Sequence, residues 1–151
     1  MKYFAYGSNM SSEELLVWCP SAVFVTIARL PNYRLDFTRH SRRRHGGVAD
    51  AVPSSGDEVW GVVYDIPSDE LAALDRKEGI AKDAYRRLHV RVTEPSGQRV
   101  RALTYTVVHK VPTELPSERY LDLILKGARE RRLPAEYVRK LEQIERRRSG
   151  D

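Results

Sequence analysis

The segment from Glu58 to Ile66 constrains the fold more than any other part of this 151-residue chain. Its residues alternate between two faces, and both faces are apolar: Trp60, Val62, Tyr64 and Ile66 on one, Val59, Gly61 and Val63 on the other. A strand of this kind has to be covered on both sides. We therefore predict that it is a central strand of a sheet.

Shorter segments with strand patterns lie on both sides of this central strand. We predict strands at 2–6, 23–28, 33–38, 85–93 and 99–108. Turn residues separate them, at Pro31-Asn32, at 53–57 and, within a hairpin, at 95–98. Gly46 and Gly47 stand side by side before residues 48–52, which predicts a bulge or a close approach of another backbone segment.

Four helices complete the prediction, at 12–18, 68–78, 117–131 and 134 to about 147. Ser11 and Glu14 have the spacing of a capping box, and Ser68 is the expected cap of the second helix. Gly79 follows that helix as a C-terminal glycine should. Together these elements indicate an α+β fold on a mostly antiparallel, barrel-like sheet, with one domain at 1–147 and a basic tail at 148–151.

Composition narrows the class of protein. Apolar residues make up 41% and charged residues 31% of the chain, which is typical of a globular domain. We expect no membrane span and no signal peptide, because no stretch is long and apolar enough. The single cysteine, Cys19, excludes an internal disulfide, suits a reducing cytoplasm, and is predicted to be a buried inert thiol.

The net charge is +5, and much of the excess lies in Arg39–His45 and in Arg146–Arg148. Arginine runs can bind nucleic acid through its phosphates, but they are more often a solvated loop and tail. No aromatic residues alternate with these arginines, so nucleic acid is not the expected partner. A basic rim would attract a small anionic substrate instead.

The first predicted strand runs directly into Gly7-Ser8-Asn9 and then into a helix. This arrangement leaves backbone N–H groups free beside the positive end of the helix, where an anion can bind. The alternative is an ordinary strand and turn without a ligand.

Glu78 is a charged residue at a position where the helix pattern predicts an apolar one. With Leu71 and Leu74 it falls at i, i+3 and i+7, on the apolar face of its helix. Desolvation and the negative helix end would both raise its proton affinity, as a general base near neutral pH requires. The alternative is that the last turn frays and Glu78 points into water. Asp75, nearer the helix centre, is the rival carboxylate.

Several common catalytic patterns do not occur in the sequence. It contains no Gly-x-Ser-x-Gly motif and no glycine-rich phosphate loop. Its four histidines lack metal-ligand spacing, so we predict neither a metal nor a cofactor. Catalysis would then depend on one acid–base group and backbone donors, which suits an intramolecular reaction.

These motifs together resemble the gamma-glutamylcyclotransferases (AIG2-like proteins). The residues that carry the resemblance span nearly the whole chain in the family's order: Tyr6-Gly7-Ser8-Asn9, Gly46–Asp50, Asp57–Tyr64, Leu74–Gly79 and the C-terminal Tyr120, Gly127-Ala128, Leu133-Pro134, Glu136-Tyr137, Leu141 and Ile144. The family pattern does not include the run Arg42–Arg44, so the role of this run stays open.

The resemblance implies a small β-barrel flanked by helices and an enzyme that releases 5-oxoproline from a gamma-glutamyl compound, a cytoplasmic lyase or transferase of glutathione metabolism. It implies that Glu78 is catalytic. The residues implied to bind the glutamyl part of the substrate are Tyr6, Gly7, Ser8, Asn9, Tyr85, Tyr105 and Tyr120. Tyr105 is equally consistent with strand packing, and Tyr120 with a core position on the stripe it shares with Ile124 and Ala128.

Two other functions remain as alternatives: a silent module that binds a gamma-glutamyl ligand, and a nucleic-acid accessory protein. The sequence does not identify the leaving amine of the substrate. It also does not decide whether the Gly7-Ser8-Asn9 backbone binds the oxyanion or the α-carboxylate. A homodimer is left open.

Overall fold

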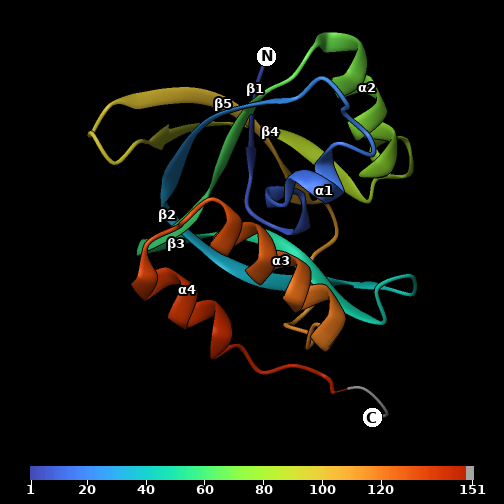
Figure 1. The fold of residues 1–151 in the computed structure, drawn as a ribbon. Coiled ribbons are helices and arrows are strands. Elements are labelled where there is room, and N and C mark those ends of the chain that lie inside the picture. The colour runs from blue at the N-terminus through green and yellow to red at the C-terminus, as the bar shows by residue number, and fades with distance from the viewer. Residues whose placement is uncertain (149–151) are drawn as a thin grey trace.

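The computed structural model describes residues 1–148 of the chain. Five strands close into a barrel in the order β1-β3-β2-β4-β5. They are β1 (Lys2–Ala5), β2 (Val23–Ser41), β3 (Gly46–Asp65), β4 (Tyr85–Thr93) and β5 (Arg99–Val107). All neighbouring strands are antiparallel except β1 and β5, which run parallel. The predicted α+β fold with a mostly antiparallel barrel is confirmed (Figure 1).

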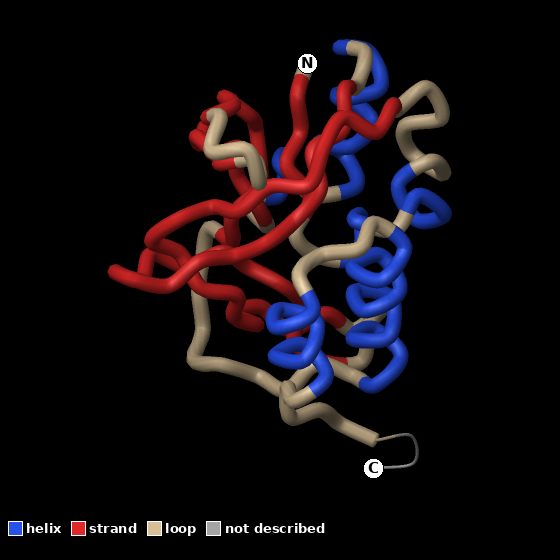
Figure 2. Tube along the Cα trace, turned by 60° about the vertical axis from the view of Figure 1, so that its left-hand side comes forward, coloured by secondary structure: helices blue, strands red, loops and turns tan. Residues whose placement is uncertain are grey.

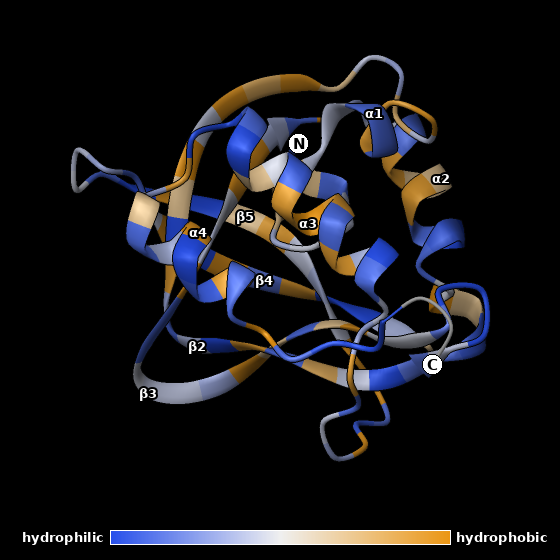
Figure 3. Cartoon of the chain, turned by 60° about the horizontal axis from the view of Figure 1, so that its bottom comes forward, coloured by the Kyte–Doolittle hydropathy of each residue, from blue (hydrophilic) through white to orange (hydrophobic). Residues whose placement is uncertain are grey.

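Helices gather on one side of this sheet, as the blue segments of Figure 2 show. They are α1 (Ser12–Leu15), α2 (Ser68–Lys77), α3 (Glu118–Glu130) and α4 (Ala135–Glu142), with short 3-10 turns η1 (Ser8–Met10) and η2 (Ile80–Lys82). Apolar and polar residues alternate along α3 and α4 (Figure 3), and the buried residues of α3 include Leu121, Ile124 and Ala128. Such an apolar stripe is what fixes an amphipathic helix against a core.

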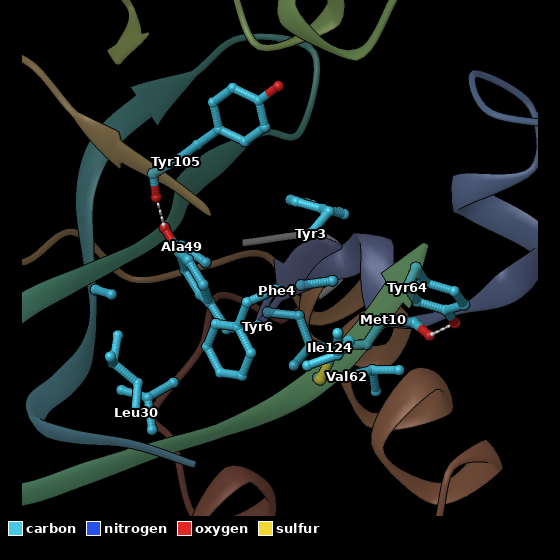
Figure 4. Packing of buried hydrophobic residues seen from close by; sticks show 14 of the residues in the cluster. Tyr3, Phe4, Tyr6, Met10, Leu30, Ala49, Val62, Tyr64, Tyr105 and Ile124 are labelled. Carbon is cyan, nitrogen blue, oxygen red and sulfur yellow. Dashed lines mark hydrogen bonds between the residues drawn. The ribbon is translucent and has the colours of Figure 1, made fainter. Parts of the chain in front are cut away.

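β3 lies between β1 and β2: residues 58–65 pair with β2 on one edge, and residues 62–65 also pair with β1 on the other. Val59, Val62 and Val63 are fully buried, and Tyr64 is 2% exposed. The hydroxyl of Tyr64 donates to the Met10 carbonyl at 2.8 Å, which ties the strand to η1 (Figure 4). The prediction of a central strand is confirmed.

Two predicted turns are wrong. The strands expected at 23–28 and 33–38 are one strand, β2, and Pro53–Asp57 lies within β3. The pairing shifts from Pro31↔Glu58 to Tyr33↔Pro53, so four residues of β3 stand opposite Asn32 alone. Asn32 has φ 65° and accepts from the Gly56 N–H at 3.1 Å. The turn residues therefore form a bulge, which lets a long strand bend around the barrel.

The helix ends also differ from the prediction. α1 ends at Leu15, and α4 ends at Glu142 because the chain then turns back so that Arg147 can pair with Ser117. Ser11 is the N-cap of α1 but makes no side-chain capping bond, and the N-cap of α2 is Pro67 and not the predicted Ser68. Ser117 does cap α3, since its hydroxyl accepts from the Tyr120 N–H at 3.1 Å.

The close approach predicted at the paired glycines is present. A Cβ on Gly47 would lie 2.2 Å from the Glu114 carbonyl oxygen. The Gly47 N–H donates to the Leu115 carbonyl at 3.0 Å, so the segment before α3 lies directly on this strand. No helix within residues 1–148 has the length and apolarity needed to cross a membrane. Of the predicted basic tail, only Arg148 lies within the described residues.

Candidate active site

A cavity of about 550 Å³ opens where five segments meet. They are the β1–η1 junction, the far end of the β2–β3 hairpin, the end of α2 with η2, the facing residues of β4 and β5, and the start of α3. All eight site residues named from the sequence line this cavity: Glu78, Tyr6, Gly7, Ser8, Asn9, Tyr85, Tyr105 and Tyr120. Residues far apart in the chain are thus brought to one place.

Glu78 is the C-cap of α2, and its N–H still donates to the Leu74 carbonyl at 2.9 Å. Gly79 follows with φ 70°, the left-handed conformation that ends many helices. The Glu78 side chain is only 15% exposed, and Leu71 and Leu74 on the same face are buried. The carboxylate therefore faces inward, toward the N-terminal turn, and not into bulk water.

Asn9 orients this carboxylate. Its Nδ2 donates to Glu78 Oε1 at 3.2 Å and to the Tyr3 hydroxyl at 3.1 Å. Its Oδ1 accepts from Lys77 Nζ at 2.7 Å. Because Nδ2 donates and Oδ1 accepts, the Asn9 amide cannot be flipped without losing these bonds. In this orientation its N–H groups point to Glu78 and Tyr3.

Lys77 is the second charge of the site. Its side chain is 10% exposed, and Nζ lies 3.6 Å from Glu78 Oε1. Burial lowers the pKa of Lys77, and the neighbouring Glu78 carboxylate partly opposes this. Lys77 and Glu78 therefore form a largely buried pair of opposite charges at the cavity.

The turn opposite Glu78 carries unpaired backbone donors. Met10 and Ser11 donate to the carbonyls of Gly7 and Ser8, at 3.1 and 3.2 Å. The N–H groups of Gly7, Ser8 and Asn9 themselves have no acceptor among residues 1–148. Three adjacent donors in a cavity of this size can bind a carboxylate or an oxyanion.

The tyrosines form the walls of the cavity and fix one another. Tyr6 donates to the Tyr105 carbonyl at 2.5 Å (Figure 4), and Tyr85 donates to the Ala49 carbonyl at 2.8 Å. The Ala49 N–H donates to the Tyr120 hydroxyl at 3.0 Å, which leaves the Tyr120 O–H proton available. Burial raises the pKa of Tyr120 to about 12 and that of Tyr85 well above its usual value, so both stay neutral.

Asp50 supports the same wall from behind. It is fully buried, and its carboxylate accepts from Thr38, Thr106, the Val107 N–H and Lys110 at 2.7 to 3.0 Å. These bonds join β2, β3, β5 and the segment after β5. They hold the adjacent Ala49, to which two of the tyrosines are bonded.

Asp75, the rival carboxylate, has a structural role. Its two oxygens accept from Arg87 at 3.1 and 2.6 Å, and Oδ1 also accepts from the Tyr105 hydroxyl at 2.6 Å. Although burial opposes ionisation, these hydrogen bonds lower the pKa of Asp75. A carboxylate held this way is a poor proton acceptor.

Sequence reasoning missed several residues that line the cavity, chiefly Tyr3, Lys77, Arg39, Ser41, Arg43 and Arg44. For Arg39 and Ser41 a signal existed, because they alternate as strand residues on one face do, whereas Arg43 lies in the turn that follows β2. It was hidden by the expectation that the strand ends at residue 38. Arg44 stacks over the Tyr120 ring at 5.5 Å and pairs with Glu14 at 3.4 Å.

Cys19 and the C-terminal arginines lie away from the residues that line the cavity. Cys19 is buried, and burial raises its pKa to about 11, as expected of an inert thiol. Arg147 and Arg148 form ion pairs with Glu114 and Glu118, at 3.3 Å each. In the described part of the chain, no three His, Cys, Asp or Glu side chains converge as metal ligands.

Comparison with known proteins identifies relatives of this chain. The sequence profile of the AIG2-like family matches residues 58–141. Gamma-glutamylcyclotransferase of Bos taurus is 40% identical over 149 residues, which cover 95% of this chain and 78% of that protein. The Homo sapiens protein of the same name is 39% identical over 147 residues, with the same shares covered.

A solved structure described as a gamma-glutamyl cyclotransferase superposes with a TM-score of 0.94 at 37% identity, covering 97% of this chain and 89% of the other. The agreement therefore includes sequence, fold and nearly the full length of the chain. This protein belongs to the gamma-glutamylcyclotransferase family.

Proposed function

We propose that this protein is a gamma-glutamylcyclotransferase in which Glu78 is the general acid and base. The reaction is an intramolecular aminolysis: the α-amine of a gamma-glutamyl group attacks its own γ-carbonyl carbon. A new C–N bond closes the five-membered ring, the old amide C–N bond breaks, and 5-oxoproline and a free amine are released. The single buried thiol suits a cytoplasmic site for this reaction.

The observation that carries the proposal is the position of Glu78. Its carboxylate is held by Asn9, is 15% exposed, and lines one cavity with Gly7, Ser8 and Asn9, whose N–H groups have no acceptor among residues 1–148. A proton acceptor and an anion-binding turn are thus within reach of one small molecule. These are the two groups that a cyclisation with a substrate-borne nucleophile requires.

In the proposed mechanism the cavity first bends the gamma-glutamyl chain so that the amine lies over the carbonyl. Orientation of this kind removes several kcal/mol from an intramolecular barrier. Glu78 then takes a proton from the α-ammonium group, and the free amine attacks. As the tetrahedral intermediate forms and collapses, Glu78 passes this proton and then the second proton of the attacking nitrogen to the departing nitrogen. The ring nitrogen keeps one hydrogen, the amine leaves as an ammonium ion, and the carboxylate is regenerated.

Lys77 and Asn9 support Glu78 in these steps. Asn9 fixes the direction of the carboxylate, and the Lys77 ammonium lies 3.6 Å from the same oxygen. Gly7, Ser8 and Asn9 offer N–H donors for the two negative groups of the reaction, the substrate α-carboxylate and the oxyanion.

The tyrosines give the cavity its shape. Tyr6, Tyr85 and Tyr105 donate their protons to protein acceptors, so they contact the substrate through their rings. Tyr120 accepts from Ala49 and retains its own proton, which makes it the tyrosine that can donate to the glutamyl part.

The test is incubation with gamma-glutamyl dipeptides and chromatographic detection of 5-oxoproline. The wild-type protein should release it, and Glu78→Gln should keep the fold while losing about 10²- to 10⁴-fold in rate. A Glu78→Gln variant with near-normal turnover would remove Glu78 from the mechanism. Binding of dipeptide without any 5-oxoproline would favour a silent binding module instead.

A nucleic-acid partner is not part of this proposal. Arg147 and Arg148 are paired with acidic residues of the same chain, and Arg39, Arg43 and Arg44 line the small-molecule cavity. These arginines therefore do not form a single free basic surface of the kind that phosphate backbones require.

A further inference from the structure

The charge of the cavity is strongly unbalanced. Among its described lining residues, Glu78 is the single carboxylate, whereas six side chains are cationic: Arg39, Arg43, Arg44, Arg76, Lys77 and Lys82. Lys77 is bonded to Asn9 beside Glu78, and Arg44 is paired with Glu14. None of the other four lies within 4.0 Å of a carboxylate belonging to residues 1–148.

These four cations come from two segments at the cavity. Arg39 and Arg43 lie on the far part of the β2–β3 hairpin, while Arg76 and Lys82 lie at the end of α2 and in η2. Arg39 is half-buried and lines the cavity. Arg43 is exposed at the tip, where it can meet a ligand that extends out of the cavity.

The gamma-glutamyl group does not account for this excess of positive charge. It carries one carboxylate and one ammonium group, which sum to zero, and the N–H groups of the turn and Glu78 already suit them. Lining charges of one sign in a concave site raise the local concentration of ligands of the opposite sign. The surplus cations therefore match the other half of the substrate, the leaving amine.

We propose that this cavity selects gamma-glutamyl compounds whose leaving amine is an acidic amino acid, carrying two carboxylates, and that Arg39 and Arg43 determine this specificity. The inference rests on the proposed function and names its substrate class. The leaving amine of an ordinary amino acid brings one carboxylate, and a simple alkylamine brings none. The efficiency of turnover should follow that order.

The sharpest comparison is between gamma-glutamyl-glutamate and gamma-glutamyl-glutamine, which have the same shape and differ in one charge. We expect kcat/KM for the glutamate compound to be about tenfold higher at low salt. The ratio should shrink several-fold near 1 M NaCl, where the Debye length is about 3 Å. Gamma-glutamyl-ethylamide should be the poorest of the three.

Arg43→Gln and Arg39→Gln should each lower this ratio about three- to fivefold, mainly through KM for the glutamate compound. Arg42→Gln is the matched control, because Arg42 is exposed on the same turn and does not line the cavity. It removes the same charge from the protein and should leave the ratio unchanged.

Calorimetric binding to the Glu78→Gln variant gives a second readout that needs no turnover. Tighter binding of gamma-glutamyl-glutamate than of gamma-glutamyl-glutamine there supports the charge selection even if catalysis fails. Equal affinity and equal kcat/KM for the two compounds, insensitive to salt, would overturn it while leaving the cyclotransferase reaction intact. Absence of 5-oxoproline from all three compounds would instead refute the proposed function.

Discussion

The amide Nδ2 of Asn9 lies 3.2 Å from Oε1 of Glu78, although 69 positions separate the two residues in the chain. Asn9 follows the first strand, and Glu78 ends the second helix. The bond joins the turn that supplies backbone donors to the residue that we propose moves protons. Since Lys77 fixes the other end of the same amide at 2.7 Å, the three side chains form one unit.

Asn9→Ala should lower kcat about ten- to a hundredfold with a smaller change in KM. The variant removes the group that orients Glu78 and leaves the buried Lys77 with one partner fewer, a loss of about 1 to 3 kcal/mol. Steady-state kinetics on a gamma-glutamyl dipeptide measure the effect. Asn32→Ala, an exposed asparagine in the β2 bulge, serves as the control and should leave kcat unaltered. An unchanged kcat in Asn9→Ala would show that Glu78 needs no such support.

Arg87→Met should destabilise the protein in a pH-dependent way. The pKa of Asp75 is lowered below its ordinary 3.8, because hydrogen bonds from Arg87 and Tyr105 outweigh the effect of burial. The stabilisation is thus present above pH 3.8 and is lost as the pH falls through the lower folded-state value. The pair is partly exposed, at 38% and 22%, so we expect about 1 kcal/mol at pH 7.

Urea unfolding at several pH values measures this difference. The gap in unfolding free energy between wild type and Arg87→Met should narrow once the pH drops below 3.8. Arg86→Met, at the neighbouring exposed position of β4, should show no comparable gap. A gap that stays constant down to pH 2 would mean that the ion pair is not its source.

Ser11→Ala should cost little or no stability, even though Ser11 precedes α1 and has the spacing of a capping box. Its hydroxyl is fully buried and makes no hydrogen bond within the described residues. Removing a buried unpaired hydroxyl is neutral or stabilising. Ser117→Ala is the contrast, because Ser117 does cap α3 and should cost about 1 kcal/mol. Equal losses for the two variants in thermal unfolding would contradict this assignment.

Gly47→Ala should destabilise the fold by about 3 kcal/mol or more. The added Cβ would lie 2.2 Å from the Glu114 carbonyl oxygen, a backbone atom that cannot rotate away. The segment it displaces leads into α3 and Tyr120, so activity should fall together with stability. Gly97→Ala, at the hairpin turn with φ 93° and open space around it, should cost only about 1 to 2 kcal/mol. Denaturant midpoints of the two variants measure the difference.

Much of the fold could be predicted because local patterns and tertiary packing agree. The two apolar faces of residues 58–65 predict a strand with neighbours on both edges, and β3 has them. The β4–β5 hairpin is also where its pattern places it, and α3 begins within one residue of its predicted start. In each case the sequence pattern covers only a few neighbouring residues. The conformation that these residues favour locally is also the one they have in the barrel.

Prediction failed where the barrel overrides a local preference. Pro31-Asn32 and Pro53–Asp57 favour turns, but continuous pairing of β2 with β3 turns them into a bulge. A second error, ending the strand at residue 38, hid the alternation of Arg39 and Ser41 at the cavity. Lys77 was missed because a lysine near a helix end is nearly always solvated, and only the packing of Asn9 against it shows otherwise.

The sequence by itself determined the central strand, the place of Glu78 on the apolar face of its helix, and the order of strand, small-residue turn and helix at the start of the chain. Each follows from residue spacing within a few turns of one helix or a few residues of one strand. This spacing is a local property of the chain. The tertiary structure alone decided that Asn9, Lys77 and Glu78 meet, that Asp75 is held by Arg87, and that unpaired arginines surround the cavity. These contacts join segments tens of residues apart, and closure of the barrel brings them together.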